Sequence, residues 1–169
     1  MNMQLSTPTP QIRPAVPDDA SSIASVLYAA FVEYKSSYTP EAFASTTPAA
    51  DQIQRRLSEG PVWVVLRDES IVGTVAVVPK GESLYVRGMA VLPDARGQKI
   101  GELLLAHIES FASARGFKRL LLSTTPFLSS AIRLYERFGF RRISDGPHDL
   151  FGTPIFTMEK LINSEPCQS

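Results

Sequence analysis

Residues 91–105 read VLPDARGQKIGELLL, and this stretch decides how the chain is interpreted. An apolar run that is typical of a β-strand ends at Pro93, a short turn follows, and an amphipathic helix begins. Because the first turn of a helix leaves backbone N–H groups unpaired and carries a partial positive charge, Arg96 and Lys99 add full charges to a ready anion site. The stretch therefore predicts a site for a pyrophosphate. The alternative is a tight turn whose two glycines serve only packing and dihedral geometry.

Two other phosphate-binding loops do not fit this stretch. The dinucleotide pattern GxGxxG needs a glycine two residues after Gly97, where Lys99 stands. The Walker pattern needs Lys followed by Ser or Thr after its last glycine, but Gly101 is followed by Glu102 and Leu103. An ATP-binding protein that uses the turn in another way is thereby disfavoured, although it stays an alternative.

The composition indicates a soluble globular protein. The chain has 169 residues, of which 44% are apolar and 20% are charged, enough for a hydrophobic core in one domain. The 17 acidic and 17 basic residues balance, so no overall field would attract nucleic acid or an anionic membrane. Residues 115–142 are locally basic, with seven Lys and Arg against Glu136 alone. Solvated helix faces and a phosphate-attracting surface both fit this region.

No metal site, disulfide or membrane segment is expected. Cys167 is the one cysteine, and His107 and His148 lack the paired spacing of zinc ligands. The first 14 residues contain no apolar core of signal-peptide length, and no apolar run is long enough to span a bilayer. We therefore expect a cytoplasmic protein without a metal, a membrane partner or a nucleic-acid partner.

Outward from residues 91–105, hydrophobic periodicity predicts strands with helices between them. Strands are expected at 11–14, 61–67, 71–78, 84–92, 120–123, 140–143 and 155–161. Helices are expected at 17–34 with Asp18 as its cap, after Thr39 as a cap, around Ile53 and Leu57 up to Gly60, from the 91–98 turn up to Gly116, and at 125–138 with Thr125 as its cap. Gly88, in the middle of a strand, indicates a bulge. The fold class is α/β or α+β with a mostly antiparallel sheet. Residues 1–10 and 162–169 are expected to be flexible, and 11–161 to form one domain.

Two separated blocks, LYVRGMAVLPDARGQKIGELLL at 84–105 and AIRLYERFGF at 131–140, together resemble the GNAT family of acyl-CoA N-acyltransferases. The resemblance implies the GNAT fold, a mixed and mostly antiparallel sheet flanked by helices, in which two central strands splay apart. It also implies an acetyl-CoA site formed by Met89, Ala90, Val91, Arg96, Gly97, Gln98, Lys99, Ile100 and Gly101. Lys99 stands where the family usually has an inner glycine, and Leu128 stands where many members have an asparagine.

By the same resemblance, the protein moves an acetyl or other acyl group from acetyl-CoA to a primary amine, by direct attack of the amine on the thioester. Tyr135 occupies the position of the family's general acid for the leaving thiolate. An aromatic residue that only packs in its helix is the alternative. A bulge near Gly88 would free backbone N–H groups for the acyl oxygen. The general base stays open among Glu33, Glu82, His148 and Asp149, and Tyr85 or Arg87 could line the same face.

The identity of the acceptor also stays open. In the family, the first two helices, their connection and the loop before the last strand form the acceptor site, here EYKSSYTPEAF at 33–43 and SDGPHDLFGTP at 144–154. These segments are aromatic and of mixed charge, which disfavours a polycationic substrate and leaves a small molecule, an amino acid or a peptide N-terminus. A non-catalytic acyl-CoA sensor with the same fold is the main alternative function, and a homodimer is left open.

Overall fold

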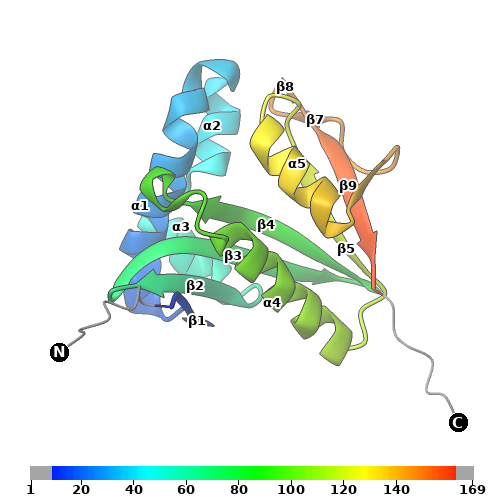
Figure 1. Ribbon diagram of the computed structural model, residues 1–169. Helices are drawn as coiled ribbons and strands as arrows, with labels where there is room; N and C mark the ends of the chain where they lie inside the picture. Colours follow the sequence, from blue (N-terminus) through cyan, green and yellow to red (C-terminus); the bar gives the residue numbers. More distant parts are fainter. Residues whose placement is uncertain (1–8, 163–169) are drawn as a thin grey trace, which may run out of the picture.

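A seven-stranded sheet organises residues 9–162, the part of the chain that the computed structural model describes (Figure 1). The strand order is β1-β2-β3-β4-β5-β9-β6, and every neighbouring pair is antiparallel except β4 and β5. The mostly antiparallel sheet that the sequence predicts is thus confirmed. Its strands are β1 (Gln11–Pro14), β2 (Val62–Arg67), β3 (Ser70–Lys80), β4 (Ser83–Val91), β5 (Arg119–Thr124), β6 (Arg141–Ile143) and β9 (Phe156–Leu161), and a separate hairpin consists of β7 (Asp149–Leu150) and β8 (Thr153–Pro154).

Helices cover both faces of this sheet. They are η1 (Pro17–Asp19), α1 (Ala20–Phe31), η2 (Val32–Ser37), α2 (Pro40–Thr46), α3 (Ala50–Arg56), η3 (Pro93–Ala95), α4 (Ile100–Ala114) and α5 (Ser129–Phe138). One face packs against α1 and α3, and the other against α4 and α5 (Figure 1). Within residues 9–162, no helix is both long and apolar enough to cross a lipid bilayer. The ends expected to be flexible fall largely on residues 1–8 and 163–169, which lie outside the described residues, as does Cys167.

The wholly apolar run in β2 follows from burial on both faces. Val62 and Val64 belong to the cluster under α1 and α3, whereas Trp63 and Val65 belong to the cluster under α4 and α5. All four side chains are buried. Because each buried side chain of this size stabilises a fold by about 1.5–3 kcal/mol relative to an exposed one, both helical layers are anchored to a single strand.

The parallel pair of β4 and β5 is short. Ser83–Val86 pair with Arg119–Leu122, and beyond Val86 the strand β4 keeps only its partnership with β3. The two strands then diverge, as the wedge between them in Figure 1 shows. The splay of central strands that the family resemblance implies is therefore confirmed, and it starts at Val86.

A bulge interrupts β4 just after this point. On β3, Thr74 pairs with Ala90 and Ala76 pairs with Arg87, so Gly88 and Met89 together lie opposite one residue of the neighbouring strand. Gly88 has a φ of 59°, which an L side chain rarely adopts. The predicted bulge at Gly88 is confirmed, and glycine is there because of the backbone conformation.

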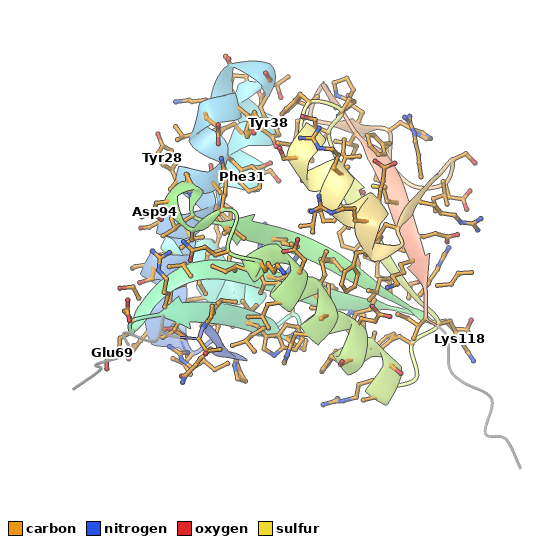
Figure 2. All side chains as sticks on the ribbon, viewed as in Figure 1. Tyr28, Phe31, Tyr38, Glu69, Asp94 and Lys118 are labelled. Carbon is orange, nitrogen blue, oxygen red and sulfur yellow. The ribbon has the colours of Figure 1, made fainter. Side chains whose placement is uncertain are left out.

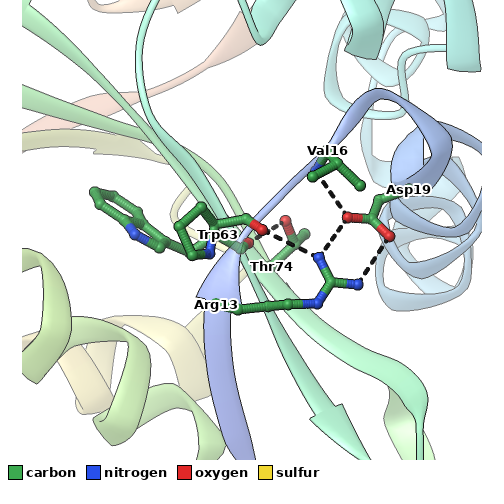
Figure 3. A network of polar contacts seen from close by, with 6 residues as sticks. Arg13, Val16, Asp19, Trp63 and Thr74 are labelled. Atoms are coloured by element: carbon green, nitrogen blue, oxygen red, sulfur yellow. Dashed lines mark hydrogen bonds and ion pairs between the residues drawn. The ribbon is translucent and has the colours of Figure 1, made fainter.

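The beginning of the first helix differs from the expectation. It starts with the short turn η1, and the carboxylate that satisfies the free backbone is that of Asp19, not that of Asp18. Asp19 accepts the Val16 N–H at 2.8 Å and two hydrogen bonds from the Arg13 guanidinium at 2.7 and 3.1 Å (Figure 3). This network joins β1 to the entry of α1, and sequence spacing alone did not distinguish the two aspartates.

The caps of the later helices are partly as predicted. Thr39 does cap α2, because its side chain accepts the Ala42 N–H at 3.2 Å. The helix expected from Thr125 begins only at Ser129, because β5 extends through Thr124 and a turn closed by the Leu128 N–H on the Thr125 carbonyl comes between. The Thr125 side chain is buried. The expected cap there was wrong.

Glu159 ties the last three strands of the sheet together. Its buried carboxylate on β9 accepts hydrogen bonds from Arg141 on β6 at 2.8 and 3.2 Å and from Arg119 on β5 at 3.0 Å. The hydrogen bonds from Arg141 and Arg119 lower the pKa of Glu159 although burial opposes this. The edge of the sheet that carries α5 thus depends on a charged carboxylate.

We expect Glu159→Gln to lower the free energy of unfolding by about 1–2 kcal/mol at pH 7, because it removes charge-assisted hydrogen bonds whose arginines are partly solvated. The folded pKa of Glu159 lies below its unfolded value, so this stabilisation is present above pH ~4.5 and is lost as the pH falls through the folded pKa. Urea unfolding at pH 7 and at pH 3 measures both effects. Glu69→Gln, in the exposed β2–β3 turn, is the matched control. A difference from wild type that stays constant between the two pH values would contradict the assignment.

Candidate functional site

A cavity of about 770 Å³ fills the wedge between β4 and β5. Its walls come from β4, the end of β5, the N-terminal turn of α4, one face of α5, and the segments around η2 and α3. This volume is within the usual range for sites that bind small molecules. Because β4 has no strand partner on this side beyond Val86, the edge of its backbone is available to a ligand.

One end of the cavity is the turn at residues 95–99, which precedes α4. Of the nine residues expected to bind acetyl-CoA, eight line the cavity: Met89, Ala90, Val91, Arg96, Gly97, Lys99, Ile100 and Gly101. Gln98 is not among its lining residues, and its side chain accepts a hydrogen bond from Arg67 at 2.9 Å. The first intrahelical bond of α4 runs from the Leu103 N–H to the Lys99 carbonyl. The N–H groups of the preceding turn therefore have no helical acceptor.

Lys99 has an unusual backbone conformation at this end. Its φ of 63° and ψ of 23° are left-handed, and it immediately precedes α4. An L residue there costs about 1–2 kcal/mol relative to the right-handed form, which accounts for the glycine that the family usually has at this position. The lysine side chain is exposed and adds a positive charge at the mouth of the cavity.

Arg96 is held by the neighbouring helices. Its guanidinium forms an ion pair with Glu33 at 2.7 Å and donates to the Ala30 carbonyl at 3.1 Å. The arginine therefore connects the turn before α4 to the end of α1 and to η2, while it still lines the cavity. Glu33, one of the four candidate bases, is occupied by this pair and is not among the cavity's lining residues.

Gly101 allows α4 and α5 to approach closely. A Cβ at this position would lie 2.7 Å from Cδ2 of Leu134. Gly101 therefore has the packing role that was the alternative to a role in anion binding. It brings α5, and with it Tyr135, to the wall of the same cavity.

Tyr135 lies in this wall and is almost completely buried. Its ring packs on that of Phe140 at 5.8 Å. Burial, with a smaller contribution from Tyr38, raises the pKa of Tyr135 to about 12. Its hydroxyl is therefore protonated throughout the physiological range and can donate a hydrogen bond.

Polar atoms without partners lie at the cavity. The Nε of Arg87 and the hydroxyl of Ser123 are buried, and neither has a hydrogen-bond partner among the described residues. Both residues line the cavity, one from β4 and one from β5. Since buried polar groups are normally satisfied, these atoms fit the presence of a polar ligand in the cavity.

The far end of the cavity is aromatic and is closed by contacts across the wedge. Tyr38 lies between α2 and α5 (Figure 2) and meets Phe127 edge to face at 4.9 Å. The Thr39 N–H donates to the Thr153 hydroxyl at 2.9 Å, and the Thr39 hydroxyl donates to the Phe151 carbonyl at 2.7 Å. The connection between η2 and α2 is thus joined across this end of the cavity to Phe127 and to the β7–β8 hairpin.

The structure separates the remaining candidates. Glu82, His148 and Asp149 are exposed and do not line the cavity, whereas Tyr85 and Arg87 do. Arg56, at the end of α3, also lines it and was missed by the sequence analysis. Nothing in the local pattern around Arg56 marks it, because its role depends on which strand α3 packs against. Among residues 9–162, no group of His, Cys, Asp and Glu is arranged to hold a metal ion.

Comparisons with known proteins agree with this geometry. The family model described as "Acetyltransferase (GNAT) family" matches residues 27–140. "Uncharacterized N-acetyltransferase YjgM" of Escherichia coli is 29% identical over 141 residues, which cover 80% of this chain and 84% of that protein. "Probable N-acetyltransferase camello" of Xenopus laevis is 37% identical over 83 residues, but these cover 47% of this chain and 38% of that protein, well under two thirds of its length.

The fold is also that of solved structures. The PaiA N-acetyltransferase of Thermoplasma acidophilum, solved in complex with coenzyme A, superposes with a TM-score of 0.78 at 17% identity, covering 90% of this chain and 99% of that one. The family model matches more than half of the chain, and both sequence blocks that resemble the family lie on the walls of one cavity. The chain therefore belongs to the GNAT family of acetyltransferases.

Proposed function

We propose that this chain is an N-acetyltransferase that moves an acetyl or other acyl group from acetyl-CoA to a primary amine of a small molecule, an amino acid or a peptide. The observation that carries the proposal is the continuous cavity, which runs from the start of α4, along the unpaired edge of β4, to Tyr135. In this proposal residues 11–161 form a single acyltransferase domain. We still predict a cytoplasmic location and no nucleic-acid or membrane partner. Whether the chain forms a homodimer is left open.

The turn before α4 would bind the diphosphate of acetyl-CoA. The free N–H groups at the start of the helix and the cation of Lys99 supply positive charge there. Met89, Ala90 and Val91 would hold the pantetheine arm, since their backbone edge faces the cavity without a strand partner. The Ser123 hydroxyl opposite gives a further hydrogen-bonding group that has no other partner among the described residues.

Transfer needs a neutral amine next to the thioester carbonyl, which the cavity provides by holding both in place. The amine nitrogen forms a bond to the acyl carbon, the carbon–sulfur bond breaks, and the nitrogen gives up a proton. Backbone N–H groups released by the bulge at Gly88 would stabilise the oxyanion of the tetrahedral intermediate. Tyr135 would donate a hydrogen bond, and finally its proton, to the departing sulfur.

The raised pKa of Tyr135 limits how it acts. A phenol whose pKa is raised to about 12 by burial is a weaker acid than a free thiol at ~8.5. Full proton transfer ahead of bond breaking is therefore disfavoured. Tyr135 is best described as a hydrogen-bond donor to the developing thiolate. It transfers its proton only after the carbon–sulfur bond has largely broken, because the sulfur becomes more basic as negative charge builds up on it in a buried site.

We expect Tyr135→Phe to lower kcat by about tenfold or more, since loss of a general acid usually costs 10²–10⁴-fold and a hydrogen-bond donor somewhat less. Affinity for acetyl-CoA should change little, because the ring and its packing on Phe140 remain. Steady-state kinetics with CoA titrations measure both. Tyr28→Phe, on the exposed side of α1 (Figure 2), is the matched control. A folded Tyr135→Phe variant with wild-type kcat would overturn the role.

Lys99→Gly should have two opposite effects. It relieves the left-handed strain and should raise the free energy of unfolding by about 1 kcal/mol without ligand. It also removes a cation at the diphosphate site and should weaken CoA binding about fivefold, equal to ~1 kcal/mol. Thermal unfolding and calorimetric titration with CoA measure the two effects separately. CoA affinity that is unchanged or improved would show that the lysine does not contact the diphosphate.

The alternative function is a non-catalytic acyl-CoA sensor. Two observations support it: Leu128 at the position where many family members have asparagine, and the high pKa of Tyr135. Incubation with acetyl-CoA and a panel of amines, with thiol release and acylated product both measured, decides between sensor and enzyme. Tight CoA binding without product from any amine would support the sensor. Stabilisation by ATP but not by CoA would reject both.

A further inference from the structure

Two arginines meet in the wall of the cavity, beside the bulge in β4. Arg56, the last residue of α3, and Arg87, on β4, both line it, and a Cβ at Gly88 would lie only 3.3 Å from Nη1 of Arg56. The guanidinium of Arg56 therefore lies directly over the bulge, beside the backbone groups proposed to bind the acyl oxygen. Arg87 is four residues from Val91, ~13 Å along an extended strand, and so is remote from the diphosphate end.

The charges at this point do not balance. Arg87 pairs with Glu59 at 3.1 Å, but its Nε is buried without a partner. Arg56 makes one long hydrogen bond, 3.5 Å to the Ser45 carbonyl, and among the described residues no carboxylate lies within ion-pair distance of it. Two guanidinium groups thus lie at the wall of a cavity beside one carboxylate, Glu59, which is within ion-pair distance of Arg87 alone. Burial, and then the proximity of Arg87, lower the pKa of Arg56, and the charge of Glu59 offsets this only in part.

A partly buried guanidinium stays charged and is costly without an anion. The diphosphate cannot be that anion if it binds at the start of α4, so the missing negative charge belongs to the other substrate. A carboxylate matches the planar, forked donors of arginine. Two cations in the wall also repel a polyamine or a lysine-rich peptide.

Resting on the proposed function, we propose that the acceptor is a free α-amino acid, whose carboxylate is bound by Arg56 and Arg87 while its amine faces the thioester. The short separation between the Arg56 guanidinium and the bulge selects a compound in which amine and carboxylate are close together. A peptide N-terminus does not fulfil this condition, because the carbonyl next to its amine belongs to an uncharged amide and not to a carboxylate. The transfer is unchanged: the nitrogen–carbon bond forms, the carbon–sulfur bond breaks, the nitrogen's proton goes to water, and the departing thiolate takes the hydroxyl proton of Tyr135, which water then restores.

The test compares matched acceptors with acetyl-CoA: each of several amino acids, its amide, and the amine that results from its decarboxylation. The wild-type chain should show kcat/KM at least tenfold higher for the preferred amino acid than for its amide or amine. Arg56→Gln should reduce kcat/KM for the amino acid by about 30–100-fold and leave that for the decarboxylated amine within about twofold. The KM for acetyl-CoA should not change. Arg55→Gln, an exposed neighbour that pairs with Asp51 on its own helix, is the matched control.

Equal use of an amino acid and its decarboxylated amine would overturn the inference while leaving the transferase function intact, as would an equal loss for both in Arg56→Gln. A second measurement does not require turnover: calorimetric titration of the CoA-loaded chain with N-acetylated amino acids and their amides. Binding that needs both the carboxylate and Arg56, in a chain that acylates nothing, would support the carboxylate site but reject its role in binding an acceptor, together with the proposed function. Binding of the amides as tightly as the acids would reject the inference.

Discussion

The structure depends on a hydrogen-bonding ladder that stops early. β4 and β5 run side by side for four residues and then separate, so that half of a central strand has backbone donors and acceptors on one side with no strand to bind them. In a buried position this would be unfavourable. It is tolerated because the groups line a cavity, and the same lack of partners gives that cavity its binding capacity. The same unpaired backbone groups that cost stability in the sheet are thus the groups that a ligand can bind.

The remaining elements keep this wedge open at a fixed width. Glu159 and its two arginines hold β5, β9 and β6 as one unit on one side. On the other side, α1 and α3 are anchored to β2, β3 and β4 through their shared apolar cluster. Close approach of α4 to α5 at Gly101, and the contacts of Thr39 with the β7–β8 hairpin, join the two halves at opposite ends. The cavity is therefore bordered by two connected halves of the molecule, and segments from both halves form its aromatic wall.

The sequence predicted those features that depend on interactions within a few residues. The strand that ends at Pro93, the turn with Arg96 and Lys99, and the stop of α5 at Gly139 all follow from backbone preferences within a few residues. Features that depend on which elements meet could not be predicted. Asp19 rather than Asp18 accepts the Val16 N–H, and Arg13 of β1 lies beside it. The proximity of the Arg56 guanidinium to Gly88 depends on the tertiary fold. The pKa of Tyr135 likewise depends on a burial that no spacing reveals.

The bulge in β4 also exchanges the two faces of the strand. Before it, Leu84 and Val86 contribute to the cluster beneath α4 and α5, whereas after it the even-numbered Ala90 belongs to the cluster beneath α1 and α3, and Met89 and Val91 pack on the α4 side. One extra residue thus shifts the strand's alternation by half a period. Removing Gly88 alone would leave a regular ladder with Met89, Ala90 and Val91 in their present layers, but the irregular backbone beside the cavity would be gone. Straightening the strand without removing a residue would turn every following side chain to the opposite layer, so the length of this strand is as constrained as its composition.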